Sequence, residues 1–286
     1  MIIVLMFYEV FTHEYFWLSF LPISLLGVGF WFLLFERSRK QKDPLILFVL
    51  AILAGGGSAM LFGFLGEFFG VEHWLAKVFG EEFCKMLCAI FIMEIFSQRF
   101  KTVAGGIVFG FSVGIGFALV ENLVYLTSAY EMGTFGPEFW LVFQGRLWSS
   151  TILHGVTTAI FGLFYAGAFL AKTVYKGSHK SPLRVFFIPP SFQAMKNILT
   201  FHFTREHLLF KNQNTLEEHR ARPIILEGFL VAFFIHVLFN LAMDQAYPAF
   251  SFFIALFFVW FLCNKMKKVG GGDNGQKEVK SVRINL

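Results

Sequence analysis

Charged residues are scarce in this chain of 286 residues, where they make up 15% of the total against 56% for hydrophobic residues. An ordinary soluble domain carries about 25% charged residues, so this composition excludes a soluble globular protein. The mean hydropathy of +0.64 points the same way. We therefore predict an integral membrane protein.

Cysteine is rare as well, and the three cysteines of the chain are too few for a disulfide framework. Internal repeats and low-complexity domains are also missing. The formal charge of +5 comes from lysines and arginines spread over loops, so we predict no nucleic-acid partner. The first twelve residues lack the features of a signal peptide, and we expect the first membrane span to act as the targeting signal.

Long apolar runs are what the chain has in abundance. Each is about twenty residues long, the length with which an α-helix crosses a bilayer. Lipid offers no hydrogen-bond partners to the backbone, and in a helix the backbone N–H and C=O groups bond to one another. The predicted fold class is all-α, a polytopic bundle of transmembrane helices. We predict seven spans, at residues 16–35, 44–65, 75–96, 103–126, 146–171, 224–244 and 247–264.

Basic residues are concentrated in alternate connections between these spans, in "ERSRKQK", "QRFK", "KTVYKGSHKSPLR" and "NKMKK". Because cytoplasmic loops are enriched in lysine and arginine, we predict the N-terminus outside and the C-terminus in the cytoplasm. Residues 1–264 are expected to form one membrane domain and residues 265–286 a disordered cytoplasmic tail. An eighth span at 185–203 is an alternative, but we interpret this proline-containing stretch as interfacial or re-entrant.

Polar residues inside the predicted spans are the candidate functional groups, because charges at membrane depth are costly and by default face a cavity or the bundle interior. Glycines in the same region, Gly106, Gly110 and Gly114, recur every four residues and predict close helix packing. The polar set is Glu81, Glu82, Lys85, Glu121, Asn122, His154, His236 and Asn240.

The predicted directions of the spans bring these residues to one depth. At about 1.5 Å of rise per residue, Glu81 and Glu82 lie a turn or two below the outer start of their span. Glu121 lies at a similar distance below the outer end of the next span, and His154 and His236 lie roughly two turns from the outer ends of theirs. Four helices of alternating direction thus place polar groups in one layer of the outer leaflet.

Two imidazoles and a carboxylate can hold a divalent metal with one open position, as in catalytic zinc sites. We predict that Glu121, His154 and His236 form this set. A second carboxylate can then act as general base toward water. Adjacent helical residues point about 100° apart, so we assign Glu81 the role of base and Glu82 a metal-facing or supporting role.

Two further residues are predicted to assist catalysis. Asn240 lies one helical turn from His236, and it can orient that histidine or bond a substrate carbonyl. Lys85 lies a turn from Glu81 and can keep that glutamate ionised.

Four short motifs carry these residues in order over residues 75–245: "EEFCK", "GFALVENLVY", "RLWSSTILHGVTTAIFG" and "HVLFN". This ordered set resembles the PrsW family of intramembrane metalloproteases, relatives of the CAAX prenyl endopeptidases in the wider Abi superfamily. The CAAX relatives show FxxxH where this chain has Phe117 to Glu121, and an arginine after the glutamate pair where it has Lys85. Both differences favour the PrsW branch, and residues 75–245 become the expected catalytic core.

The resemblance implies a glutamate pair that activates water, together with histidines and a further acidic residue that bind metal. We therefore predict a zinc-dependent endopeptidase of the bacterial inner membrane that cleaves a membrane-anchored protein near the extracytoplasmic side. The family suggests an anti-sigma factor as substrate. Two alternatives stay open: a non-catalytic, chaperone-like binding protein, and an ion-coupled carrier, which would be expected to show paired repeats with broken helices.

Overall fold

The computed structural model describes residues 21–39, 45–96, 103–133, 135–176, 218–244 and 248–270, and within these ranges it contains helices and no β-strand. The α-helices are α2 (Leu21–Arg39), α3 (Leu45–Phe68), α4 (Trp74–Ile95), α5 (Val103–Gly133), α6 (Pro137–Gly145), α7 (Thr151–Lys176), α11 (Glu218–Asp244) and α12 (Pro248–Gly270). A π-helical turn, η3 (Arg146–Ser150), joins α6 to α7. The predicted all-α class is confirmed for this part of the chain.

Each of the seven predicted spans overlaps one of these helices. Helix α4 is more polar than the others because it carries Glu81, Glu82 and Lys85, and α2 and α12 contain shorter apolar stretches. The count of seven spans remains a prediction, and residues 185–203 lie outside the described ranges. Four helices are long and apolar enough to cross a membrane within the described residues: Leu45–Phe68, Val103–Met132, Thr151–Ala168 and Ile225–Met243.

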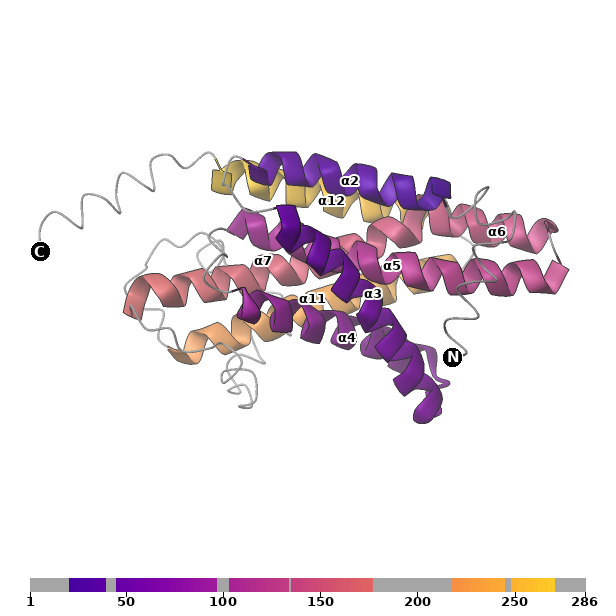
Figure 1. Cartoon of the computed structure of the whole chain (residues 1–286), viewed down its shortest axis with the longest axis horizontal. Helices are drawn as coiled ribbons and strands as arrows, with labels where there is room; N and C mark the ends of the chain where they lie inside the picture. Colours follow the sequence, from indigo (N-terminus) through magenta and orange to yellow (C-terminus); the bar gives the residue numbers. More distant parts are fainter. Residues whose placement is uncertain are drawn as a thin grey trace, which may run out of the picture.

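Helices α5 and α7 form the centre of the bundle, where they lie side by side (Figure 1). Nearly all residues of their apolar stretches are buried, whereas fewer than half of those in α3 and α11 are. Helix α3 packs against α5, α11 packs against α7, and α4 contacts both α3 and α11. Helices α2 and α12 run together along one edge (Figure 1). This arrangement surrounds α5 and α7, which carry Glu121 and His154, with other helices.

Glycines bring the backbone of α5 into direct contact with its neighbours. A Cβ atom on Gly110 would lie 2.3 Å from the carbonyl oxygen of Thr158, and one on Gly114 would lie 2.1 Å from that of His154. No side chain fits at such distances, so α5 and α7 can approach this closely because glycine occupies these positions. The predicted packing role of these glycines is confirmed.

Replacing Gly114 by alanine is expected to destabilise the folded protein by about 1–3 kcal/mol, because the new methyl group would occupy the space of the α7 backbone. The measurement is thermal unfolding of the purified protein in detergent. Gly57→Ala is the matched control, since a Cβ there meets nothing within 4 Å. Equal melting temperatures for the two variants would contradict the backbone contact.

The predicted orientation places Ser38 and Ser178 in the cytoplasm, because they belong to the basic connections. In a variant whose three native cysteines have been replaced, Ser38→Cys and Ser178→Cys should not react with an impermeant thiol reagent in intact cells. Glu72→Cys, in the exposed connection between α3 and α4, should react. Labelling of Ser38→Cys or Ser178→Cys would overturn the orientation; Ser178 itself lies outside the described ranges.

Helix α12 continues to Gly270, past the predicted end of the last span at residue 264. The added turns contain lysine and methionine, which are good helix formers, and the helix stops in a run of glycines. Helix α12 therefore includes residues 265–270, which the sequence assigned to the tail. Residues 271–286 lie outside the described ranges.

Candidate active site

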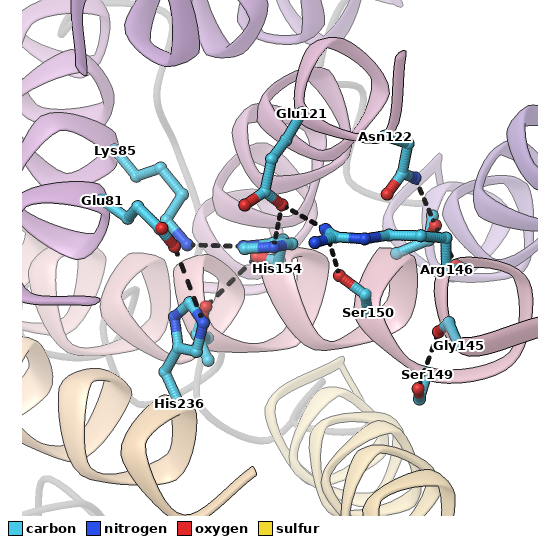
Figure 2. A network of polar contacts seen from close by, with 12 residues as sticks. Glu81, Lys85, Glu121, Asn122, Gly145, Arg146, Ser149, Ser150, His154 and His236 are labelled. Carbon is cyan, nitrogen blue, oxygen red and sulfur yellow. Dashed lines mark hydrogen bonds and ion pairs between the residues drawn. The ribbon is translucent and has the colours of Figure 1, made fainter. Parts of the chain in front are cut away.

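Four helices contribute polar side chains to the middle of the bundle. Figure 2 shows Glu81, Lys85, Glu121, His154 and His236 directed toward one another from α4, α5, α7 and α11. The structure therefore brings together residues that lie far apart in the sequence, from four neighbouring helices.

Glu82 points into the packed interior of the bundle. Its Oε1 atom accepts a hydrogen bond from Nζ of Lys85 at 2.6 Å and lies 2.7 Å from Nδ1 of His236. The hydroxyl group of Thr157 is a third donor, at 3.2 Å. Three donors from three helices therefore converge on one oxygen of a carboxylate that is 3% exposed.

Lys85 is fully buried and connects Glu82 to His154. Its Nζ atom lies 3.0 Å from Nδ1 of His154. An ammonium group can only donate, so Nδ1 of His154 is the acceptor in this contact. The sequence suggested that Lys85 would serve Glu81, but its ion pair is with Glu82, three residues away on α4.

His236 has its two ring nitrogens in different surroundings. The Glu82 carboxylate accepts at Nδ1, so this nitrogen carries the proton and Nε2 presents its lone pair. Nε2 lies 3.6 Å from Oε2 of Glu81. A carboxylate that holds one nitrogen while the other remains available is the usual arrangement around a metal-binding histidine.

Glu81, His154 and His236 each offer an atom that could bind metal, and these three atoms lie within 4.8 Å of one another. All three residues are buried, and two imidazoles with a carboxylate are the donor set of one class of catalytic zinc site. The residues present therefore fit a divalent metal ion. Glu121, which the sequence placed in this set, contacts His154 with 2.7 Å between its Oε2 and the histidine Nε2.

A cavity of about 300 Å³ lies beside this group. Glu81 faces the cavity while Glu82 faces the interior, as the angle between adjacent helical residues requires. The polar residues that line the cavity include Glu81, Glu121, Arg146, His154, His236 and Asn240. The apolar residues that line it include Leu141, Val142, Phe239 and Met243. The site thus offers acid–base groups and an apolar wall in one space.

Arg146 is a residue of this site that the sequence analysis did not single out. Its Nη1 atom donates to Oε2 of Glu121 at 2.7 Å. The available signal was the spacing of Arg146, Ser150 and His154 at four-residue steps, which places them on one helical face. Arg146 is, however, the first residue of the predicted span 146–171, where an arginine can equally serve as an anchor at the membrane interface. The spacing alone therefore did not identify it as a site residue.

Residues 44–210, more than half of the chain, match the family described as PrsW family intramembrane metalloprotease. No curated protein and no solved structure matches the chain. The matched region contains α4, α5 and α7 with Glu81, Glu121 and His154, and a metalloprotease family implies a divalent metal, which the donor set accommodates. The chain therefore belongs to the PrsW family of intramembrane metalloproteases, enzymes that hydrolyse peptide bonds.

Proposed function

We propose that the protein is a zinc-dependent endopeptidase that cleaves a membrane-anchored protein near the extracytoplasmic face of a bacterial inner membrane. The observation that supports this most strongly is the buried group of Glu81, His154 and His236 beside a cavity. Membership in a family of peptide hydrolases argues against the non-catalytic binder and the carrier. Zinc is favoured because histidine and carboxylate donors with an open position are typical of its catalytic sites.

His236 holds the ion through Nε2, and His154 holds it through the nitrogen that Glu121 contacts, together with one carboxylate, for which Glu81 and Glu121 are both placed. Nδ1 of His154 must then carry the ring proton, and Lys85 keeps its ion pair with Glu82 alone. When bound, the ion supplies Lewis acidity toward water and the scissile carbonyl group. A general base must also lie close by, so proximity alone does not separate the ligand from the base.

The partners of the two carboxylates support a division of roles. Glu121 is paired with Arg146 and His154 through one oxygen, so its position is fixed by two partners, as is usual for a ligand carboxylate. Glu81 faces the cavity, and its shortest ion-pair contact among the described residues is 3.6 Å, to His236. We therefore assign Glu121 to the metal and keep Glu81 as the base.

The remaining residues support the reaction in the following way. Glu81 takes a proton from the attacking water and delivers it to the departing amide nitrogen. Glu82 holds the Nδ1 proton of His236, so this ring is fixed in orientation with Nε2 directed away from Glu82. Asn240, in the cavity wall, donates to the substrate carbonyl oxygen.

The lining of the cavity fits a substrate that is itself a membrane protein. Apolar side chains from α6 and α11 line the same cavity as the carboxylates and imidazoles, so the cavity can take an apolar side chain of the substrate while the substrate backbone meets the polar groups. From the family resemblance we propose an anti-sigma factor with a membrane anchor as the substrate.

The test is to compare the N-termini of membrane proteins in cells that express the wild-type enzyme or its Glu81→Gln variant. Mass spectrometry of labelled N-termini should find new termini with the wild-type enzyme alone, at or near the extracytoplasmic ends of single-span proteins. Identical sets of termini in both membranes would contradict the proposed function.

A further inference from the structure

Arg146 is held rigidly beside the site by three contacts in different directions. Its Nη1 atom donates to Oε2 of Glu121 at 2.7 Å and to Oγ of Ser150 at 3.0 Å (Figure 2). Its guanidinium carbon lies 3.5 Å from the centre of the Tyr125 ring. A planar guanidinium that is stacked on one side and hydrogen-bonded at its edge has little freedom to turn.

The backbone around Arg146 is fixed as well. Its carbonyl oxygen accepts a hydrogen bond from the Thr151 hydroxyl at 2.8 Å, and that hydroxyl accepts one from the Asn122 amide, also at 2.8 Å. Asn122 follows Glu121 on α5, so two adjacent residues of α5 hold the two ends of the π-helical turn. Single π-helical turns occur frequently at functional sites.

The pair of Arg146 and Glu121 is largely removed from solvent, with side chains 14% and 15% exposed. The same Oε2 atom of Glu121 that accepts from Arg146 contacts Nε2 of His154. The guanidinium therefore determines which way the carboxylate faces and keeps its oxygen directed at the histidine.

We propose that Arg146 is a positioning residue of the active site, which holds the Glu121 carboxylate against His154 in the orientation that the metal centre requires. This inference rests on the proposed function. Arg146 acts through Glu121 and is not itself a metal ligand, because a guanidinium has donors and no acceptor. Outer partners of metal-binding residues typically account for about 10- to 100-fold in metal affinity.

The experiment measures zinc affinity of the purified full-length protein in detergent, by competition with a chromophoric chelator. Arg146→Met should weaken zinc binding by about 10- to 100-fold. Arg146→Lys keeps the charge but loses the planar fork, so its affinity should lie between those of Arg146→Met and the wild type. Ser149→Ala is the matched control in the same turn, since its hydroxyl bonds the Gly145 carbonyl instead, and it should bind zinc normally.

A double-mutant cycle with Glu121→Gln separates positioning from a general structural effect. If Arg146 acts through Glu121, adding Arg146→Met to Glu121→Gln will cause no further loss of affinity. The double variant removes both charges of the Arg146–Glu121 pair. No charge of the pair is then left without its partner, so the double variant is expected to fold. Additive losses, or normal affinity in Arg146→Met, would overturn this inference alone, whereas a wild-type protein without zinc affinity would overturn the proposed function with it.

Discussion

Glutamine at position 81 is expected to slow peptide-bond cleavage by about 100- to 10,000-fold while zinc stays bound, because the amide has the shape of the carboxylate without its basicity. Glu81 lines the cavity, and its contact with His236 is 3.6 Å long, so the substitution breaks no short hydrogen bond of the described residues. A neutral amide is also cheaper to bury than a carboxylate, and we expect normal folding.

The measurement combines kcat/KM on a membrane-anchored substrate with zinc content by elemental analysis and a melting curve. Glu72→Gln, an exposed glutamate ahead of α4, is the matched control and should behave like the wild type. Loss of zinc from Glu81→Gln would make Glu81 a ligand, and the base would then have to be sought elsewhere in the cavity. Full activity would remove Glu81 from the chemistry altogether.

Alanine at His154 or His236 is expected to lower both the zinc affinity and the cleavage rate by more than about 100-fold. Loss of a residue that only supports a ligand already lowers metal affinity or activity by up to about 100-fold. Both histidines are buried and belong to the group whose donor atoms lie within 4.8 Å of one another. Elemental analysis after dialysis against a weak chelator measures the first effect, and the cleavage assay measures the second.

His73→Ala is the control for this pair, because His73 is exposed at the N-terminal end of α4, away from the cavity lining. The two active-site variants also test each histidine separately. His154 has a partner at both ring nitrogens, Lys85 and Glu121. Zinc retained in His154→Ala but lost in His236→Ala would make His154 a hydrogen-bonding residue, and zinc retained in both would place the ion elsewhere.

The positions of the helices could be predicted from the sequence because the length of an apolar run limits where a membrane helix can lie. The polar layer followed from the alternating directions of those helices, which bring His154 and His236 to one depth. Both features depend on distances along a helix axis, and such distances follow from the rise per residue.

Contacts that depend on the rotation of a helix about its axis could not be predicted in the same way. Lys85 can reach back to Glu81 or to Glu82 from its place on α4, and the packing of α4 against α7 and α11 decides for Glu82. Arg146 was missed because its role depends on the position of Glu121, which lies on another helix. Sequence spacing within one helix contains no information on either contact.

Gly114 and His154 touch backbone to backbone, so α5 and α7 cannot roll or slide past each other without a clash. By contrast, glycines of α4 and α11 meet their neighbours through side chains, Gly80 at Phe62 and Gly228 at Phe164. We therefore expect α5 and α7 to move as one rigid body. A motion of α4 against this body would take about microseconds to milliseconds and would have to open the contacts of Lys85 with His154 and of Glu82 with Thr157. Such a motion would carry the residues of α4 toward and away from those of the fixed pair. Admission of a substrate and assembly of the catalytic group would then be a single movement.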